Sequence, residues 1–139
     1  METHLESLLR NMRPRPGALE SEIMEIESAL GVQLPPDYVE FLRASNGAEG
    51  AIGHSHVVLF SLERVKSISK TYDLPRYSPG LVPFGDDGAM MVYGFDMRQN
   101  TPTIIEVDYV CIGIEEDTRV HNMTFVKFLE YLSTRLTVE

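Results

Sequence analysis

The order of periodic segments along the chain predicts an α+β fold. Helix-like spacing dominates the first third, strand-like runs follow from about residue 57, and a helix pattern closes the chain. This order lacks the strand–helix–strand alternation of a parallel sheet. With 139 residues, 43% of them hydrophobic and 24% charged, the sequence has the size and composition of one globular domain over residues 1–139.

The first expected element is a short helix at the N-terminus. The apolar residues from Leu5 to Met12 have the spacing of one helix face, and Thr3 is placed to cap it. Pro14 ends this pattern, because proline lacks an amide hydrogen and clashes with the preceding turn. Residues 1–17 are therefore expected to form an N-terminal helical extension.

Two further helices are expected before the strands. The pattern over residues 19–30 turns apolar side chains inward and glutamates outward, and Gly31 is placed to cap its end. The next helix begins at Pro35-Pro36-Asp37, since proline suits a first turn and an aspartate there complements the helix dipole. Asn46-Gly47 supplies the left-handed backbone that ends this helix and turns the chain toward the sheet.

The middle of the chain is expected to begin the sheet. Glycines over residues 47–53 indicate a flexible loop, and the apolar residues 57–60 indicate a short buried strand. Residues 62–72 are ambiguous, with an apolar spacing that fits a helix. Residues 73–80 contain two prolines and are expected to form a loop.

The last part of the chain is expected to complete the sheet and to end in a helix. Strand-like runs cover residues 81–84, 89–96, 103–108 and 109–114. Asp87-Gly88 between two apolar runs is a hairpin signal. A final helix is expected from Asn122, whose side chain can cap it.

Charge and targeting signals narrow the classes of partner. A formal net charge of −9 argues against nucleic acid, whose binding requires basic side chains, and against an anionic membrane surface. The N-terminus has no signal-peptide pattern, and no stretch approaches the roughly 18 consecutive apolar residues of a membrane helix. A single cysteine excludes an intrachain disulfide. The expected location is the cytoplasm.

The negative charge is concentrated in one segment. Residues 86–117 hold eight acidic side chains and one basic one, Arg98, a net charge of −7. Such a focused field favours encounter with a basic partner, although acidic turns also simply keep proteins soluble. The candidate partner-binding face comprises Asp86, Asp87, Asp96, Asp108, Glu115, Glu116 and Asp117. Tyr77, Tyr93 and Tyr109 are candidate aromatic anchors, each equally compatible with a core position.

Signals for catalysis or metal binding are weak. His54 and His56 would share one face of a strand and could hold a metal with added carboxylates, although neighbouring loop histidines are usually only solvated. Cys111 lies in an apolar run, where a thiol is expected to be buried and inert. The acidic residues are too numerous for their spacing to select an acid–base pair. We therefore expect a non-enzymatic protein without a cofactor or metal.

Several short motifs recur together in one known family. They are Glu22-Ile23, Ile26-Glu27, Leu30-Gly31, Leu34-Pro35-Pro36-Asp37-Tyr38, Phe41-Leu42, Asn46-Gly47, Phe84-Gly85-Asp86-Asp87-Gly88, Tyr93, Phe95-Asp96, Thr124-Phe125 and Phe128-Leu129. Over about residues 19–132 the chain thereby resembles the SUKH superfamily, which contains Smi/Knr-type fungal cell-wall regulators and many bacterial toxin-immunity proteins.

The resemblance implies a fold and a function. The fold would be one curved, mostly antiparallel sheet with N-terminal helices and a C-terminal helix packed around it. The function would be that of the bacterial relatives, which bind and neutralise a cognate toxin, often a basic nuclease that an acidic surface complements. The alternatives are a regulatory scaffold of the Smi/Knr type and, third, a small-ligand or metal-binding enzyme built around His54 and His56.

Overall fold

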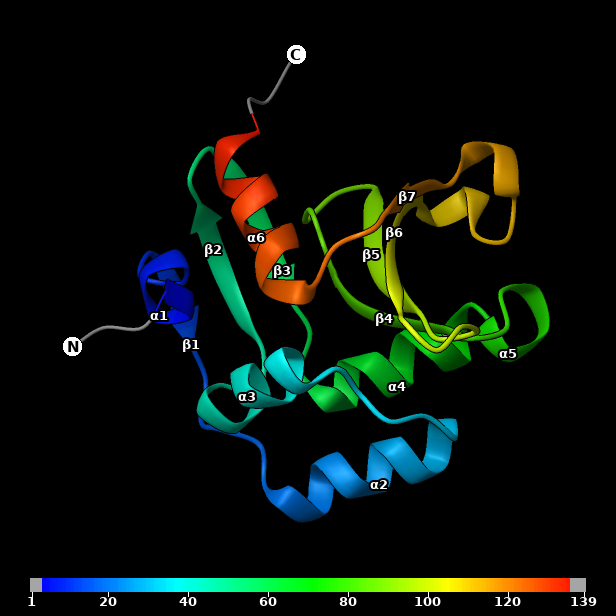
Figure 1. Ribbon diagram of the computed structural model, residues 1–139, viewed down its shortest axis with the longest axis horizontal. Helices are drawn as coiled ribbons and strands as arrows, with labels where there is room; N and C mark the ends of the chain where they lie inside the picture. The colour runs from blue at the N-terminus through cyan, green and yellow to red at the C-terminus, as the bar shows by residue number, and fades with distance from the viewer. Residues whose placement is uncertain (1–3, 136–139) are drawn as a thin grey trace.

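The computed structural model describes residues 4–135 and contains one antiparallel sheet whose strand order follows the chain (Figure 1). The strands are β1 (Met12–Pro14), β2 (Ala48–Ile52), β3 (Ser55–Leu59), β4 (Leu81–Asp86), β5 (Met91–Asp96), β6 (Thr103–Asp108) and β7 (Arg119–His121). The helices are α1 (His4–Leu8), α2 (Glu20–Leu30), α3 (Pro36–Ala44), α4 (Leu62–Thr71), α5 (Leu74–Tyr77) and α6 (Phe125–Thr134), with 3-10 turns η1 (Tyr109–Cys111) and η2 (Glu115–Asp117). The predicted α+β fold is confirmed.

The main core lies on one face of the sheet, beneath α2, α3 and α6. An aromatic cluster fills it: the Phe84 and Phe95 ring centroids are 4.6 Å apart, and Tyr38 of α3 lies 5.1 Å from Phe95 and 5.2 Å from Phe125 of α6. These four side chains are fully buried or nearly so. Helix α6 crosses in front of β2 and β3 (Figure 1).

The opposite face of the sheet is covered over only part of its width. Over β4, β5 and β6 it carries a second, smaller core that includes Leu81, Val92 and Val107, packed under Tyr72 and Tyr109. On the β1–β3 side the same face carries the cross-strand partners Arg13, Glu49 and Val58. Strand β3 pairs with β4 at only two positions, Val58↔Asp86 and Leu59↔Gly85, so the two strands diverge and the sheet opens there.

The signals for helix ends are confirmed where they depend on local backbone chemistry. Gly31 closes α2 in the left-handed region at φ 67, and Gly47 has φ 93 after α3. The Asn46 side chain accepts a hydrogen bond from the Leu62 amide of α4. Asp37, at the start of α3, also accepts one from the Val126 amide, and so joins two helix N-termini. No helix in the part of the chain that the structure describes is long and apolar enough to cross a membrane.

Two predictions in the N-terminal half are wrong. Within residues 4–17, the described part of the expected helical extension 1–17, only α1 is helical, and Met12 lies in the edge strand β1; the proposed cap Thr3 lies outside the described residues. The glycine-rich segment 47–53, expected as a loop, contains β2. Gly50 permits this because a Cβ there would lie 2.7 Å from the Asn11 carbonyl oxygen, so only glycine lets β1 pair so closely with β2.

Later elements also differ from expectation. Residues 73–80 include the short helix α5, and residues 109–114 form η1 and a turn instead of a strand, because Asp108 caps Val110 with its side chain. Strand β7 was not predicted. The final helix is confirmed, but its cap is Thr124, whose hydroxyl accepts a hydrogen bond from the Lys127 amide, and not Asn122.

Candidate functional site

The seven carboxylates predicted as one face lie in two groups. Asp86, Asp87 and Asp108 lie at one end of the β4–β6 strands, since Met91 follows the hairpin turn and pairs with Asp108. Asp96 lies at the other end, where it pairs with Leu81. Glu115, Glu116 and Asp117 form η2, and Glu115 lines one small cavity together with Asp96.

The first group has structural roles. Asp86 is 7% exposed, and its two oxygens accept hydrogen bonds from the Tyr109 hydroxyl (2.7 Å) and the Gly88 amide (2.9 Å). One oxygen of Asp87 accepts from the amides of Ala89, Met90 and Met91 and so shapes the hairpin. The side chain of Asp108 caps η1. These carboxylates organise the turns at this end of the sheet.

The second group is more open to solvent. Asp96 forms a two-point ion pair with Arg98, at 2.9 and 2.8 Å, and this contact lowers the pKa of the Asp96 carboxyl. Glu115, Glu116 and Asp117 are all exposed. They are acidic side chains that a partner can reach.

Exposed apolar side chains surround this second group. Tyr77, Val110, Ile114 and Val120 are 57%, 85%, 44% and 58% exposed. Tyr77, Asp96, Glu115 and Val120 line a shallow cavity of about 320 Å³. We call the set formed by Tyr77, Asp96, Glu115, Glu116, Asp117 and Val120 the acidic corner. Apolar side chains exposed inside a polar rim are typical of protein interaction sites.

A glycine holds the acidic corner together. Gly113 has φ 91, and a Cβ built on it would overlap the Tyr77 carbonyl oxygen. The loop before η2 therefore packs directly on the end of α5. Of the predicted aromatic anchors, Tyr77 is exposed here, Tyr93 is buried in the main core, and Tyr109 is half-buried against Asp86.

One acid of the negative segment lies inside the protein. The Glu106 side chain is 3% exposed and forms ion pairs with Arg135 (2.8 Å) and His121 (3.1 Å). Burial by itself would raise the pKa of Glu106, but Arg135 and His121 outweigh it and hold the pKa below its ordinary value. Glu106 of β6 therefore links the sheet to the end of α6 through Arg135, and its burial keeps it from contacting an external partner.

The residues considered for metal binding do not come together. His54 lies in the turn between β2 and β3, and His56 packs against Gly88 and lies 3.6 Å from Glu49. Among residues 4–135 no group of three or more His, Cys, Asp or Glu side chains could hold a metal ion. Cys111, expected to be buried in a strand, lies half-buried in η1.

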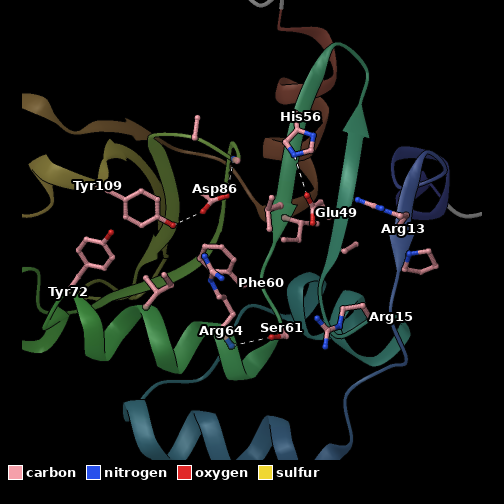
Figure 2. A pocket seen from close by; sticks show the side chains of 17 residues that line it. Arg13, Arg15, Glu49, His56, Phe60, Ser61, Arg64, Tyr72, Asp86 and Tyr109 are labelled. Atoms are coloured by element: carbon pink, nitrogen blue, oxygen red, sulfur yellow. Dashed lines mark hydrogen bonds and ion pairs between the residues drawn. The ribbon is translucent and has the colours of Figure 1, made fainter.

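A large polar cavity lies where β3 and β4 diverge, and sequence reasoning missed most of it. Its volume is about 690 Å³, and its polar lining includes Arg13, Arg15 and Arg64 as well as Glu49 and Asp86. Figure 2 shows Arg13 and Arg15 pointing toward this cleft from the N-terminal edge of the sheet and Arg64 entering it from α4. We call this cavity the arginine cleft.

The model of the SMI1 / KNR4 family (SUKH-1) matches residues 17–131. The chain belongs to this family. The SUKH-1 match runs from just before α2 into α6 and includes the acidic corner, whereas Arg13 and Arg15 precede it. No curated protein matches the chain.

Proposed function

We propose that this SUKH-1 protein is a non-enzymatic, cytoplasmic binding module of the immunity type, which binds and neutralises a cognate bacterial toxin. The observation that carries the proposal is the acidic corner, where the exposed side chains of Tyr77 and Val120 line one cavity with Asp96 and Glu115 on a member of this family. The partner we propose is a basic toxin domain such as a nuclease, whose basic side chains bind the phosphates of nucleic acid.

The two kinds of side chain at the corner would contribute differently. Tyr77 offers a rigid, exposed ring, and tyrosine is enriched among residues whose truncation costs binding most. Glu115, Glu116 and Asp117 would guide a basic surface into place and raise its association rate. Because the net charge of the whole chain is −9, the long-range field acts in the same direction.

The test begins with the genes beside the one for this protein and uses any toxin domain that they encode. We expect the purified protein to inhibit that domain and to bind it in calorimetry. Tyr77→Ala should weaken binding by roughly 30-fold, the size of a hot-spot residue. The double variant Glu115→Gln/Glu116→Gln should weaken it about 3- to 10-fold and reduce its salt dependence, as expected for exposed charge pairs.

A matched control removes two exposed carboxylates elsewhere. Glu40 in α3 and Glu63 in α4 are both exposed, so Glu40→Gln/Glu63→Gln changes the net charge equally without touching the corner. Equal loss of binding in both double variants would contradict the proposed surface. Binding of a neighbouring non-toxin protein, with no effect on any toxin domain, would instead support a regulatory scaffold.

A further inference from the structure

The arginine cleft brings together three arginines that form no ion pair with the described residues. No carboxylate of the described residues lies within ion-pair distance of Arg13, Arg15 or Arg64. Elsewhere in residues 4–135 the guanidinium groups of Arg43, Arg98, Arg119 and Arg135 each contact a carboxylate. The cleft thus gathers basic groups whose anionic partner is not supplied by this part of the protein itself.

Local structure orients the Arg64 side chain and fixes the backbone of Arg15. The Arg64 guanidinium lies 5.4 Å from the centre of the Phe60 ring, a cation–π contact, while its backbone amide donates to the Ser61 cap of α4. The amide of Arg15 donates to the Ser45 hydroxyl, which fixes the backbone after β1. An anion that enters between β1 and α4 would therefore meet an Arg64 guanidinium that Phe60 already orients, with Arg15 on a fixed backbone opposite it.

The two carboxylates that line the cleft are engaged in other contacts. Asp86 accepts hydrogen bonds from Tyr109 and Gly88, and Glu49 lies beside His56. With three arginines against two carboxylates, the cleft carries a net charge of +1 when His56 is neutral. This charge suits one carboxylate better than a doubly charged phosphate.

The remaining lining indicates that the carboxylate belongs to a peptide. Tyr72 and Tyr109 stack with ring centroids 5.0 Å apart and form an aromatic wall beside the arginines. A volume of about 690 Å³ holds several peptide atoms beyond a carboxylate. We infer that the arginine cleft is a second binding site, separate from the acidic corner, for an acidic peptide segment whose Asp or Glu carboxylate contacts Arg15 and Arg64.

The test titrates the isotope-labelled full chain with short peptides followed by NMR. The probe is a glycine peptide with a central Asp-Gln pair and both ends blocked, which carries one carboxylate; its Asn-Gln counterpart, acetate and inorganic phosphate are the comparisons. We expect the acidic peptide to bind with a Kd of about 1 mM or tighter. The Asn-Gln peptide and acetate should bind at least tenfold more weakly, and amide shifts should map to Arg15, Ser61 and Tyr109.

Single variants then locate the contact. Arg15→Gln and Arg64→Gln should each weaken the acidic peptide about tenfold, whereas Lys70→Gln, an equal charge change on the exposed side of α4, should leave it unchanged. Thermal unfolding checks that each variant is folded. If Arg64→Gln is unfolded because its contact with Phe60 is lost, peptide binding by Arg15→Gln alone tests the inference.

Several results would overturn the inference. They are no detectable binding of the acidic peptide, equal binding of the Asn-Gln peptide, phosphate binding as tight as the peptide's, or arginine variants indistinguishable from Lys70→Gln. Because Glu115→Gln/Glu116→Gln should leave peptide binding unchanged, failure at the cleft is distinguishable from failure at the acidic corner.

Discussion

The variant Asp86→Ala tests whether this carboxylate of the negative segment stabilises the fold. The side chain is 7% exposed and accepts two hydrogen bonds, from the Tyr109 hydroxyl and the Gly88 amide. Hydrogen bonds to a charged group contribute roughly 1.5–3 kcal/mol each. Gly88 is exposed and Tyr109 half-buried, so water can replace part of both bonds, and the buried carboxylate no longer has to be desolvated. We expect a net loss of about 2 kcal/mol in the free energy of unfolding.

The assay is urea unfolding at neutral pH for Asp86→Ala, Tyr109→Phe and the double variant. The cycle should give a coupling energy of about 1–2 kcal/mol, because each single substitution removes the same 2.7 Å hydrogen bond. Glu63→Ala is the control: this exposed carboxylate should change stability by less than about 0.5 kcal/mol.

The stabilisation by this hydrogen bond should be lost at alkaline pH. Burial and the bond to Asp86 raise the pKa of Tyr109 above the ordinary tyrosine value of 10.0, so the stabilisation is complete below about pH 10 and is lost above it. That alkaline loss should be smaller in Asp86→Ala. An unfolding free energy equal to the parent's, combined with weaker toxin binding, would refute the reasoning and return Asp86 to the binding face.

Two further substitutions test the anchor of α6 and the packing of the acidic corner. Arg135→Leu leaves Glu106 buried with His121 as its close partner and should cost roughly 3 kcal/mol at neutral pH in urea unfolding. Since the folded-state pKa of Glu106 lies below the ordinary glutamate value of 4.5, the stabilities of parent and variant should converge as the pH falls below about 4.5, and a constant difference would contradict this. Gly113→Ala should cost about 1–3 kcal/mol and weaken toxin binding, because its Cβ would overlap Tyr77. Gly31→Ala, also at positive φ but with nothing within 4 Å, should affect stability alone.

The features that sequence predicted correctly depend on neighbouring residues. Gly31 ends α2 because its own backbone adopts φ 67, and Asp87-Gly88 forms a hairpin because the Asp87 side chain bonds the amides that follow it. The three-residue carboxylate run of η2 is exposed for a similar reason, since a short turn has no inner face for it. Local chemistry of this kind is visible in a window of a few residues.

The features that were missed depend on contacts between distant segments. The sequence around Gly50 predicts a loop, because nothing in it shows that the Asn11 carbonyl oxygen lies 2.7 Å from where a Cβ of Gly50 would be. The sequence does not show that Asp86 and Glu106 are buried, because their partners Tyr109 and Arg135 are 23 and 29 residues away along the chain. The arginine cleft joins residues of β1 to Arg64 of α4, and no spacing rule connects them.

The net charge therefore describes the protein less well than the positions of its charges. The acidic corner and the arginine cleft contact opposite ends of β4, which five residue steps of about 3.3 Å place roughly 17 Å apart. That separation is about twice the screening length of 8 Å at physiological ionic strength, so under those conditions the charges of one surface have little effect on binding at the other.

At low salt the screening length exceeds the separation, and the overall charge of −9 then favours a basic partner at the acidic corner and opposes an acidic peptide at the arginine cleft. Added salt should thus weaken the toxin complex strongly and the peptide complex little, because in the cleft the loss of local attraction is offset by the loss of long-range repulsion.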